Sequence, residues 1–353
     1  MKVAVIGAGN VGVAIAADLS IKGHEVDLIK TSQVRSDVFD RIISNNNRVY
    51  LKEDGEYTKT KISSVSHELS NVTETDVIFI TIQSTYHQRL IEQLSRYLNR
   101  NQIVVCICSY MSSFYFTAFC NFKPTVVETT GPYLEGRVEM EDKLNEVVFR
   151  VGCRLTRSPL SISSDKSFQP TMDKLHELYA GFSLEYSVLE SALLNPNMVL
   201  HTVGAIMSIP RIEYSHGNFC MYCEAYARGN EATINIMLQL DEEKKNIIKA
   251  LCGTPVDIFD AGGFLGNPLE SFYSYSESPD RAISPTSVHS RYITEDVSQG
   301  LVLLESIGKH IGVKTPITTA LIDIASGALK YDFRENGRTI YKLGAVEYID
   351  SLT

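Results

Sequence analysis

The chain has 353 residues, of which 44% are hydrophobic and 21% charged, a composition typical of a soluble globular protein with room for two domains. The formal net charge is −9 and the sequence has no block of basic residues, which argues against a nucleic-acid or anionic-membrane partner. The longest apolar runs, such as 77–82, are too short to span a bilayer. Seven scattered cysteines and the lack of an export signal predict reduced thiols and a cytoplasmic location.

A glycine-rich turn follows the first apolar run. The β-branched run 2–6 is typical of a buried parallel strand, the apolar spacing over 13–22 predicts a helix, and 25–29 predicts the next strand. A GxGxxG pattern in this setting gives a tight turn, close approach to a pyrophosphate and close helix packing, and the helix N-terminus favours phosphate. We therefore expect a dinucleotide to contact Gly7, Gly9, Asn10, Val11 and Gly12.

The end of the second predicted strand departs from the usual dinucleotide pattern. An acidic residue is expected there to bind the adenosine ribose, but the sequence has Lys30, Thr31 and Ser32, with Arg35 shortly after. A cation with hydroxyl groups suits a 2′-phosphate, so these residues predict NADP rather than NAD. The alternative is that Lys30 and Arg35 are solvated loop charges, which leaves NAD possible.

Strands and helices alternate through the first half, which predicts a Rossmann-type doubly wound parallel sheet domain over 1–186. Further strands are expected at 61–65, 76–82, 102–107, 125–129 and 146–151, with a helix at 88–98. Gln83 follows a strand at its carboxyl end, where ligands bind in such sheets, and is expected to contact the cofactor. The loop 129–133 is another candidate lining, whereas His87 is interpreted as a surface or packing residue.

The second half, 187–353, is predicted to be an all-α domain. Helices are expected at 188–194, 196–208, 222–240, 241–251, 294–311 and 316–329, with a long loop over 262–285 and a closing segment over 339–352. Asn195 is expected to cap the helix that Pro196 begins. Asn197 and His201 then share one face, and His201 is either a core histidine satisfied by hydrogen bonds or an acid/base group.

Local chemistry alone gives the remaining polar residues structural roles. Thr294 is expected to cap a helix, Asp296 to sit in its first turn, and Arg291 to be a surface charge. Cys220 and Cys223 form a CxxC without a second pair at zinc-ligand spacing, so no metal site is predicted.

Four segments together resemble the octopine/nopaline (opine) dehydrogenase family. They are GAGNVG at 7–12, NPNMVLHTVGAIMS at 195–208, HSRYITEDVSQGLV at 289–302 and GRTIYKLG at 337–344. The resemblance implies an enzyme that condenses an amino acid with a 2-oxo acid such as pyruvate and reduces the imine with NAD(P)H. It places a catalytic pair on His201 and Asp296 and a carboxylate-binding role on Arg291, beside which we assign Asn197 to the substrate. A homodimer through the helical half is expected.

Two other functions stay open. One is a reductase of a single keto acid, like ketopantoate reductase or glycerol-3-phosphate dehydrogenase, although those families use a lysine at the start of the second domain and 195–208 contains none. The other is a non-catalytic NADPH-binding sensor, which has no need of His201, Asp296 and Arg291 together.

Overall fold

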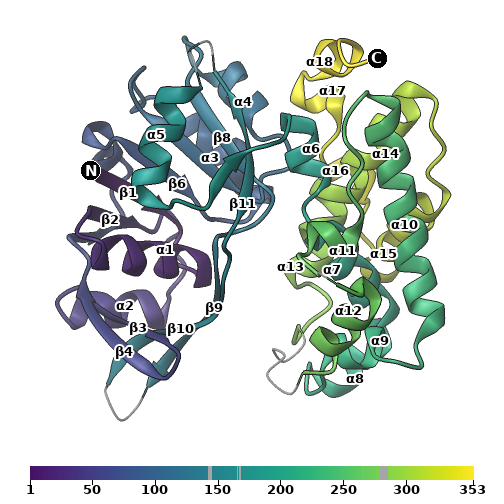
Figure 1. Ribbon diagram of the computed structural model, residues 1–353, viewed down its shortest axis with the longest axis horizontal. Helices are drawn as coiled ribbons and strands as arrows, with labels where there is room; N and C mark the ends of the chain where they lie inside the picture. The colour runs from purple at the N-terminus through teal and green to yellow at the C-terminus, as the bar shows by residue number, and fades with distance from the viewer. Residues whose placement is uncertain (142–144, 165, 167, 265, 279–284) are drawn as a thin grey trace. The chain divides into compact units, whose positions relative to one another are not determined.

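The computed structural model describes residues 1–141, 145–164, 166, 168–264, 266–278 and 285–353. The chain divides into two compact units, unit 1 (Met1–Ser191) and unit 2 (Ala192–Thr353). The division lies within helix α6 (Val188–Leu193), close to the 186/187 border expected from the sequence. Unit 1 combines sheets and helices, and the described residues of unit 2 form helices only (Figure 1).

The main sheet of unit 1 has eight strands in the order β12-β11-β8-β7-β6-β1-β2-β5. Every neighbouring pair is parallel except β8 and β11, so the predicted doubly wound sheet is present. The three central strands β7, β6 and β1 are almost wholly apolar and buried, as expected where helices cover both faces. The strands are β1 (Lys2–Ile6), β2 (Glu25–Ile29), β5 (Ser64–Ser66), β6 (Val77–Ile80), β7 (Ile103–Ile107), β8 (Thr125–Thr129), β11 (Ser158–Ser163) and β12 (Phe182–Leu184).

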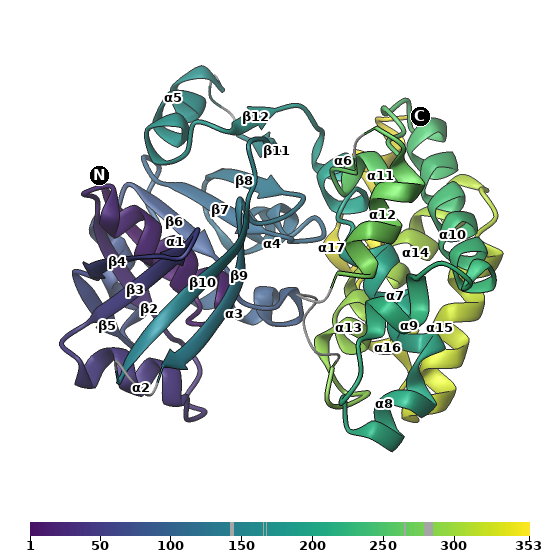
Figure 2. The ribbon, with the colours of Figure 1, turned by 60° about the horizontal axis from the view of Figure 1, so that its bottom comes forward.

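A second, four-stranded sheet has the order β4-β3-β10-β9 and was not foreseen as a separate sheet. Its strands are β3 (Arg48–Glu53), β4 (Glu56–Lys61), β9 (Leu134–Glu141) and β10 (Glu146–Arg154), and Figure 2 shows the last two lying side by side. The strand expected at 61–65 is wrong, because it spans the end of β4 and the start of β5. The Ile62 N–H between them donates to the Asn47 carbonyl, so the chain changes sheets there.

A buried polar cluster joins this second sheet to helix α1 (Asn10–Ile21). Asp18 of α1 accepts from the Tyr133 hydroxyl at 3.0 Å and pairs with Arg154 of β10 at 2.8 Å. Burial, with the nearby Asp18 carboxylate, raises the pKa of Tyr133 well above its usual value. Tyr133 is fully buried and stacks on Tyr179, so this residue of the 129–133 loop packs in the core and does not line a binding site.

The other helices of unit 1 are α2 (Asp37–Ser44), η1 (Leu69–Glu74), η2 (Ser84–Tyr86), α3 (His87–Leu94), α4 (Ser113–Phe119) and α5 (Gln169–Leu178). Helix α3 ends four residues before the predicted position. His87 is fully buried, with its ring nitrogens against the Ser112 hydroxyl and the Ile82 carbonyl. Its expected packing role is therefore confirmed, and surface exposure is wrong.

The helices of unit 2 surround α7 (Asn197–Met207), which carries His201. The Asn195 side chain accepts from the Asn197 N–H at 3.1 Å and the Asn195 carbonyl accepts from Met198. The helix itself begins at Asn197 with Pro196 in the capping position, one residue later than expected. The remaining helices are α8 (Ile209–Ser215), α9 (Met221–Tyr226), α10 (Glu231–Ala250), α11 (Ile258–Ala261), α12 (Pro268–Ser276), α13 (Arg291–Thr294), η3 (Asp296–Leu301), α14 (Val302–Ile311), α15 (Pro316–Leu329), α16 (Phe333–Asn336), α17 (Ile340–Leu343) and α18 (Val346–Asp350).

Four predictions for unit 2 are wrong. The helix expected at 222–240 is broken between α9 and α10, where Gly229 has a left-handed φ of 96°, and α10 then continues through the predicted break at 241. Within the loop expected at 262–285, the Asn267 side chain caps α12; residues 265 and 279–284 of that loop lie outside the described residues. Thr294 does not cap a helix, because helical structure already begins at Arg291.

The segment 291–311 is a continuous helical rod with a π-helical stretch, η3, at its centre. The Ser298 carbonyl in η3 accepts from the Arg338 N–H at 2.8 Å. A Cβ on Gly337 would lie 2.7 Å from the same carbonyl, so the close approach requires glycine. The GRTIYKLG segment is thus packed directly against the turn that carries Asp296.

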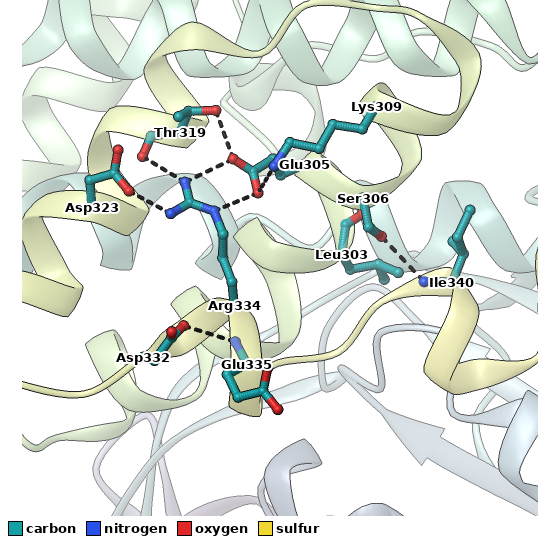
Figure 3. Close-up of polar contacts among 10 residues, drawn as sticks. All are labelled: Leu303, Glu305, Ser306, Lys309, Thr319, Asp323, Asp332, Arg334, Glu335 and Ile340. Atoms are coloured by element: carbon teal, nitrogen blue, oxygen red, sulfur yellow. Dashed lines mark hydrogen bonds and ion pairs between the residues drawn. The ribbon is translucent and has the colours of Figure 1, made fainter.

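An ion-pair cluster holds the other end of this rod (Figure 3). Glu305 of α14 accepts from Arg334 of α16 at 2.8 Å, from Lys309 at 2.8 Å and from Thr319 of α15 at 2.8 Å. Arg334 also pairs with Asp323 of α15. Three helices are therefore joined through one buried carboxylate.

No single described helix is long and apolar enough to cross a membrane; a bent pair, 188–207 with 209–215, meets the length and composition criteria together.

Candidate functional site

The glycine-rich turn between β1 and α1 has the geometry of a phosphate cradle. Gly7 has a φ of 120°, and a Cβ there would lie 2.6 Å from the Thr81 hydroxyl. A Cβ on Gly12 would lie 1.7 Å from the Gly7 carbonyl oxygen, so the first turn of α1 rests on the loop. A Cβ on Gly9 would meet nothing within 4 Å. The loop is tight on its inner side and open at Gly9, which fits a dinucleotide pyrophosphate.

The start of α1 complements that open side. Gly9 precedes the helix without a side-chain cap, so N–H groups of the first turn face the cradle. The Asn10 side chain accepts from the Val138 N–H of β9 at 2.9 Å, so in this structure it ties the helix to the second sheet. Val11 is half-buried. Thr81, whose hydroxyl donates to the carbonyls of Ile6 and Gly7, supports the cradle and was not singled out from the sequence.

The residues expected to select the cofactor lie together beyond β2. The Lys30 ammonium donates to the Ser32 and Val34 carbonyls and lies 5.8 Å from the centre of the Phe39 ring. Arg35 lies 3.3 Å from Asp37 at the start of α2. Both cations therefore have partners within this loop, and Thr31 and Ser32 lie between them in the chain.

Two further polar residues of unit 1 lie on β2 and just beyond β6. Asp27 of β2 is half-buried, and burial, with the neighbouring Glu25 charge, raises the pKa of its carboxyl group. Gln83 lies just beyond β6 and begins η2, at the carboxyl edge of the main sheet. Its place in the fold agrees with the expectation that it contacts the cofactor, which stays a prediction.

His201 and Asp296 are brought together in unit 2. His201 Nδ1 and Asp296 Oδ2 are 2.8 Å apart, and both side chains are buried, 6% and 2% exposed. Ninety-five residues separate them in the chain. Helical structure begins at Arg291, five residues before Asp296, so Asp296 lies inside the helical segment and not in its first turn, where a capping or dipole-compensating carboxylate would be. A carboxylate at Nδ1 fixes the orientation and the tautomer of the imidazole.

The other two predicted substrate residues lie on the same elements. Arg291 begins α13, is exposed, and approaches Glu295 at 3.8 Å. Asn197 begins α7, one turn before His201, and is half-buried. The sequence interpretation missed Tyr292, whose ring stacks on His201 with centroids 3.7 Å apart. The sequence did contain a clue to its position: Tyr292 precedes Asp296 by four residues, so in a helix the two side chains lie on the same face.

Cys220 and Cys223 lie at the start of α9, where the Cys223 N–H donates to Cys220 Sγ. Among the described residues, no group of three or more histidine, cysteine or acidic side chains is arranged to hold a metal ion.

Comparison with known proteins finds a protein family whose model matches the helical half of this chain. Residues 185–329 match the model of the alpha-helical domain of NAD/NADP octopine/nopaline dehydrogenase. An opine dehydrogenase of Arthrobacter sp. (strain 1C) is 24% identical over 97% of this chain and 94% of its own length. The protein ocs of Agrobacterium vitis is 26% identical over 97% of this chain and 95% of its own.

The helical half of the chain is therefore similar to the helical domain of the octopine/nopaline dehydrogenases.

Solved structures agree with the fold of the family. Octopine dehydrogenase in complex with NADH and agmatine has a TM-score of 0.74 at 15% identity, covering 99% of this chain and 97% of that one. A ketopantoate reductase of Ralstonia eutropha JMP134 has a TM-score of 0.65 at 18% identity, covering 94% and 99%. Residues 3–108 also match the ketopantoate reductase model, so the cofactor half is common to both kinds of enzyme.

Proposed function

We propose that this protein is an NAD(P)H-dependent opine dehydrogenase that condenses an amino acid with a 2-oxo acid and reduces the resulting imine. The observation that carries the proposal is the buried contact between His201 and Asp296 inside the domain that matches the family. Octopine dehydrogenase, a protein of the same fold, has been described with NADH and L-arginine and with NADH and pyruvate. The reaction joins an amine nitrogen to a carbonyl carbon with loss of water.

His201 supplies the proton transfers. The Asp296 carboxylate accepts from Nδ1–H and stabilises the imidazolium, so Nε2 is the nitrogen that donates and accepts. The departing hydroxyl of the amine–carbonyl adduct needs a proton, and so does the amine product after reduction. An imidazole suits both steps because its proton exchanges near neutral pH.

The other residues bind and orient. Arg291 offers two parallel N–H groups to a substrate carboxylate, and Asn197, one helical turn before His201, offers an amide. The cradle at Gly7, Gly9 and Gly12 binds the pyrophosphate of the nicotinamide cofactor, which supplies the hydride when bound.

For the cofactor we propose NADPH in preference to NADH. The support is the pair of cations, Lys30 and Arg35, beyond β2 where NAD enzymes carry an acidic residue. Both cations would have to exchange their present partners for a 2′-phosphate. Michaelis constants for the two cofactors test this, and a lower constant for NADH would contradict it.

The decisive experiment is a screen of amino acids with pyruvate and either cofactor, with the product identified by mass. We expect oxidation of the cofactor to require the amine and to yield a secondary-amine dicarboxylate. The shared cofactor half favours one competing function, the reduction of a single keto acid. That function predicts oxidation without the amine and a hydroxy-acid product, but α7 has no lysine to match it. Cofactor binding without turnover on any substrate pair would support the sensor.

Assembly is a separate proposal. We infer a homodimer through the helical unit, which sedimentation at micromolar concentration would test; a monomer across that range would contradict it.

A further inference from the structure

One turn of helix contacts the His201 imidazole on two sides. Tyr292 of α13 and Asp296 of η3 are four residues apart in a continuous helical segment, so their side chains point the same way. The Tyr292 ring lies against the face of His201, with centroids 3.7 Å apart and planes inclined by 5°. Asp296 Oδ2 lies 2.8 Å from Nδ1 at the edge of the ring. The imidazole is therefore held on one face and one edge.

These contacts restrain different motions. The hydrogen bond at Nδ1 fixes the rotation of the ring in its own plane, and the stack resists tilting out of that plane. Together they fix the direction in which Nε2 points.

The stack also distinguishes the two protonation states of His201. Two neutral aromatic rings prefer offset or edge-to-face packing over a face-to-face arrangement with nearly parallel planes. A cation over the electron-rich face of a phenol ring is attracted to it. The observed geometry therefore suits the imidazolium better than the neutral imidazole.

We propose that Tyr292 is a positioning residue that holds the ring plane of His201 and favours its protonated form. The proposal rests on the acid/base role proposed for His201. It concerns a side chain that reaches the reaction only through the imidazole.

Other charged groups around α7 act on the same proton. The Arg291 guanidinium lies 5.7 Å from the centre of the Tyr292 ring and 3.8 Å from Glu295, so both charges lie beside the stacked tyrosine. Tyr226 of α9 donates its hydroxyl to the Leu200 carbonyl. Several other charged side chains on the elements packed on α7 have partners elsewhere: Asp241 pairs with Lys244, Glu243 with the start of α15, Asp323 with Arg334, and Arg211 with Glu224. The ring must therefore be changed without altering these charges.

Tyr292→Leu and Tyr292→Phe provide that contrast. The first removes the aromatic face and the second keeps it, and neither changes a charge. We would follow the His201 imidazole by NMR in the full chain labelled with ¹⁵N-histidine, assigning it among the 8 histidines with His201→Gln. Loss of the ring destabilises the cation, so Tyr292→Leu should lower the titration midpoint by about half a pH unit or more. Tyr292→Phe should stay within about 0.2 units of the wild type.

The pH profile of kcat/KM gives the second readout. For condensation, the limb that reports His201 should move to lower pH in Tyr292→Leu by the same amount as the NMR midpoint. Tyr341→Leu, the same change at an exposed tyrosine beside His310, is the matched control and should leave His201 unmoved. An unshifted His201 midpoint in Tyr292→Leu overturns the proposal, whatever happens to the rate. A shifted midpoint in a protein that condenses no substrate pair would refute the proposed function and leave the inference intact.

Discussion

His201 and His310 each contact a carboxylate in the helical unit, but in very different surroundings. The His310–Asp350 pair, at 2.6 Å, lies at the surface, with 58% of the Asp350 side chain exposed. The His201–Asp296 pair is buried. Water and salt screen an exposed pair to between about 0 and 1 kcal/mol, whereas burial strengthens the contact and makes loss of one partner costly. The two pairs have similar distances, but breaking the buried pair should cost more than breaking the exposed one.

Those two pairs give a matched test of the catalytic assignment. His201→Ala should abolish condensation while cofactor binding persists, because the cradle lies in unit 1. Asp296→Asn should lower kcat by about 10²–10⁴, less than His201→Ala, because the amide no longer stabilises the imidazolium. Steady-state rates and cofactor fluorescence titration provide the measurements.

Asp350→Asn supplies the control, since it breaks the exposed pair and should leave kcat unchanged. Activity of His201→Ala within a few fold of the wild type would refute the assignment.

The first turn of helix α15 is capped by the carboxylate of Glu243, which belongs to helix α10. Glu243 of α10 is buried and accepts from the Ile317 and Thr318 N–H groups, at 2.6 and 2.9 Å, and from the Thr318 hydroxyl. Pro316 occupies the first position, so these are among the N–H groups that the helix itself leaves unpaired. A side chain distant in sequence thus fixes where α15 starts.

Removing that carboxylate should destabilise the helical unit. We expect Glu243→Ala to lower the free energy of unfolding by about 2 kcal/mol, because the buried N–H groups lose their acceptor. Glu243→Gln should cost less, since one oxygen remains. Urea unfolding followed by circular dichroism measures both. The adjacent Glu242→Ala, at a side chain 58% exposed, should change stability by no more than about 0.5 kcal/mol; equal losses at 242 and 243 would contradict the capping role.

The cluster around Glu305 makes the helical unit sensitive to acid (Figure 3). Burial alone would raise the pKa of Glu305, but hydrogen bonds from Arg334, Lys309 and Thr319 outweigh it and lower the pKa from 4.5 to about 2. A carboxylate with a depressed folded-state pKa stabilises the fold fully above its unfolded value and loses this contribution as the pH falls through the folded value. The stabilisation should therefore disappear between pH 4.5 and about 2.

Glu305→Gln tests that window. The variant should be less stable than the wild type at neutral pH, and the difference should shrink as the pH falls from 4.5 towards 2. Urea midpoints at a series of pH values measure it. A difference that stays constant across the series would show that the ionised carboxylate is not what joins the three helices.

At the scale of the whole protein, the cradle couples cofactor binding to stability. Gly9 has an extended φ of −86° and open space around it, so Gly9→Ala should fold normally and obstruct only the phosphates. Gly12→Ala should destabilise the protein even without cofactor, because its Cβ would clash with the Gly7 carbonyl. At 100 times its dissociation constant the cofactor should stabilise the wild type by about 2.7 kcal/mol.

Thermal unfolding with and without cofactor separates the two variants. Gly9→Ala should match the wild type alone and lose most of the rise on adding cofactor. A full rise in Gly9→Ala would place the pyrophosphate elsewhere.

Sequence patterns predicted the parallel core and α7 because short apolar strands, the glycine turn and Asn195-Pro196 are local signals. The second sheet escaped prediction because β4, with its sequence EYTKTK, is mostly exposed and shows no apolar alternation, and because β3 pairs with β10 about a hundred residues away. The contact between His201 and Asp296 could be expected only through family resemblance. From its neighbours in the chain alone, Asp296 was assigned to the end of a helix, because no local signal indicates that the helical segment begins at Arg291.

The π-helical turn has a consequence for how this part of the chain can change. A π-helical turn contains one residue more than an α-helical turn. In this wider turn the Ser298 carbonyl accepts a hydrogen bond from the Arg338 N–H. Deleting one residue from 297–300 would let the helix close into regular α form and rotate everything on one side of the turn by about 100° relative to the other. The deletion would therefore break either the contacts of Tyr292 and Asp296 with His201 or the ion pair between Glu305 and Arg334. We therefore expect a one-residue deletion in 297–300 to disrupt the helical unit.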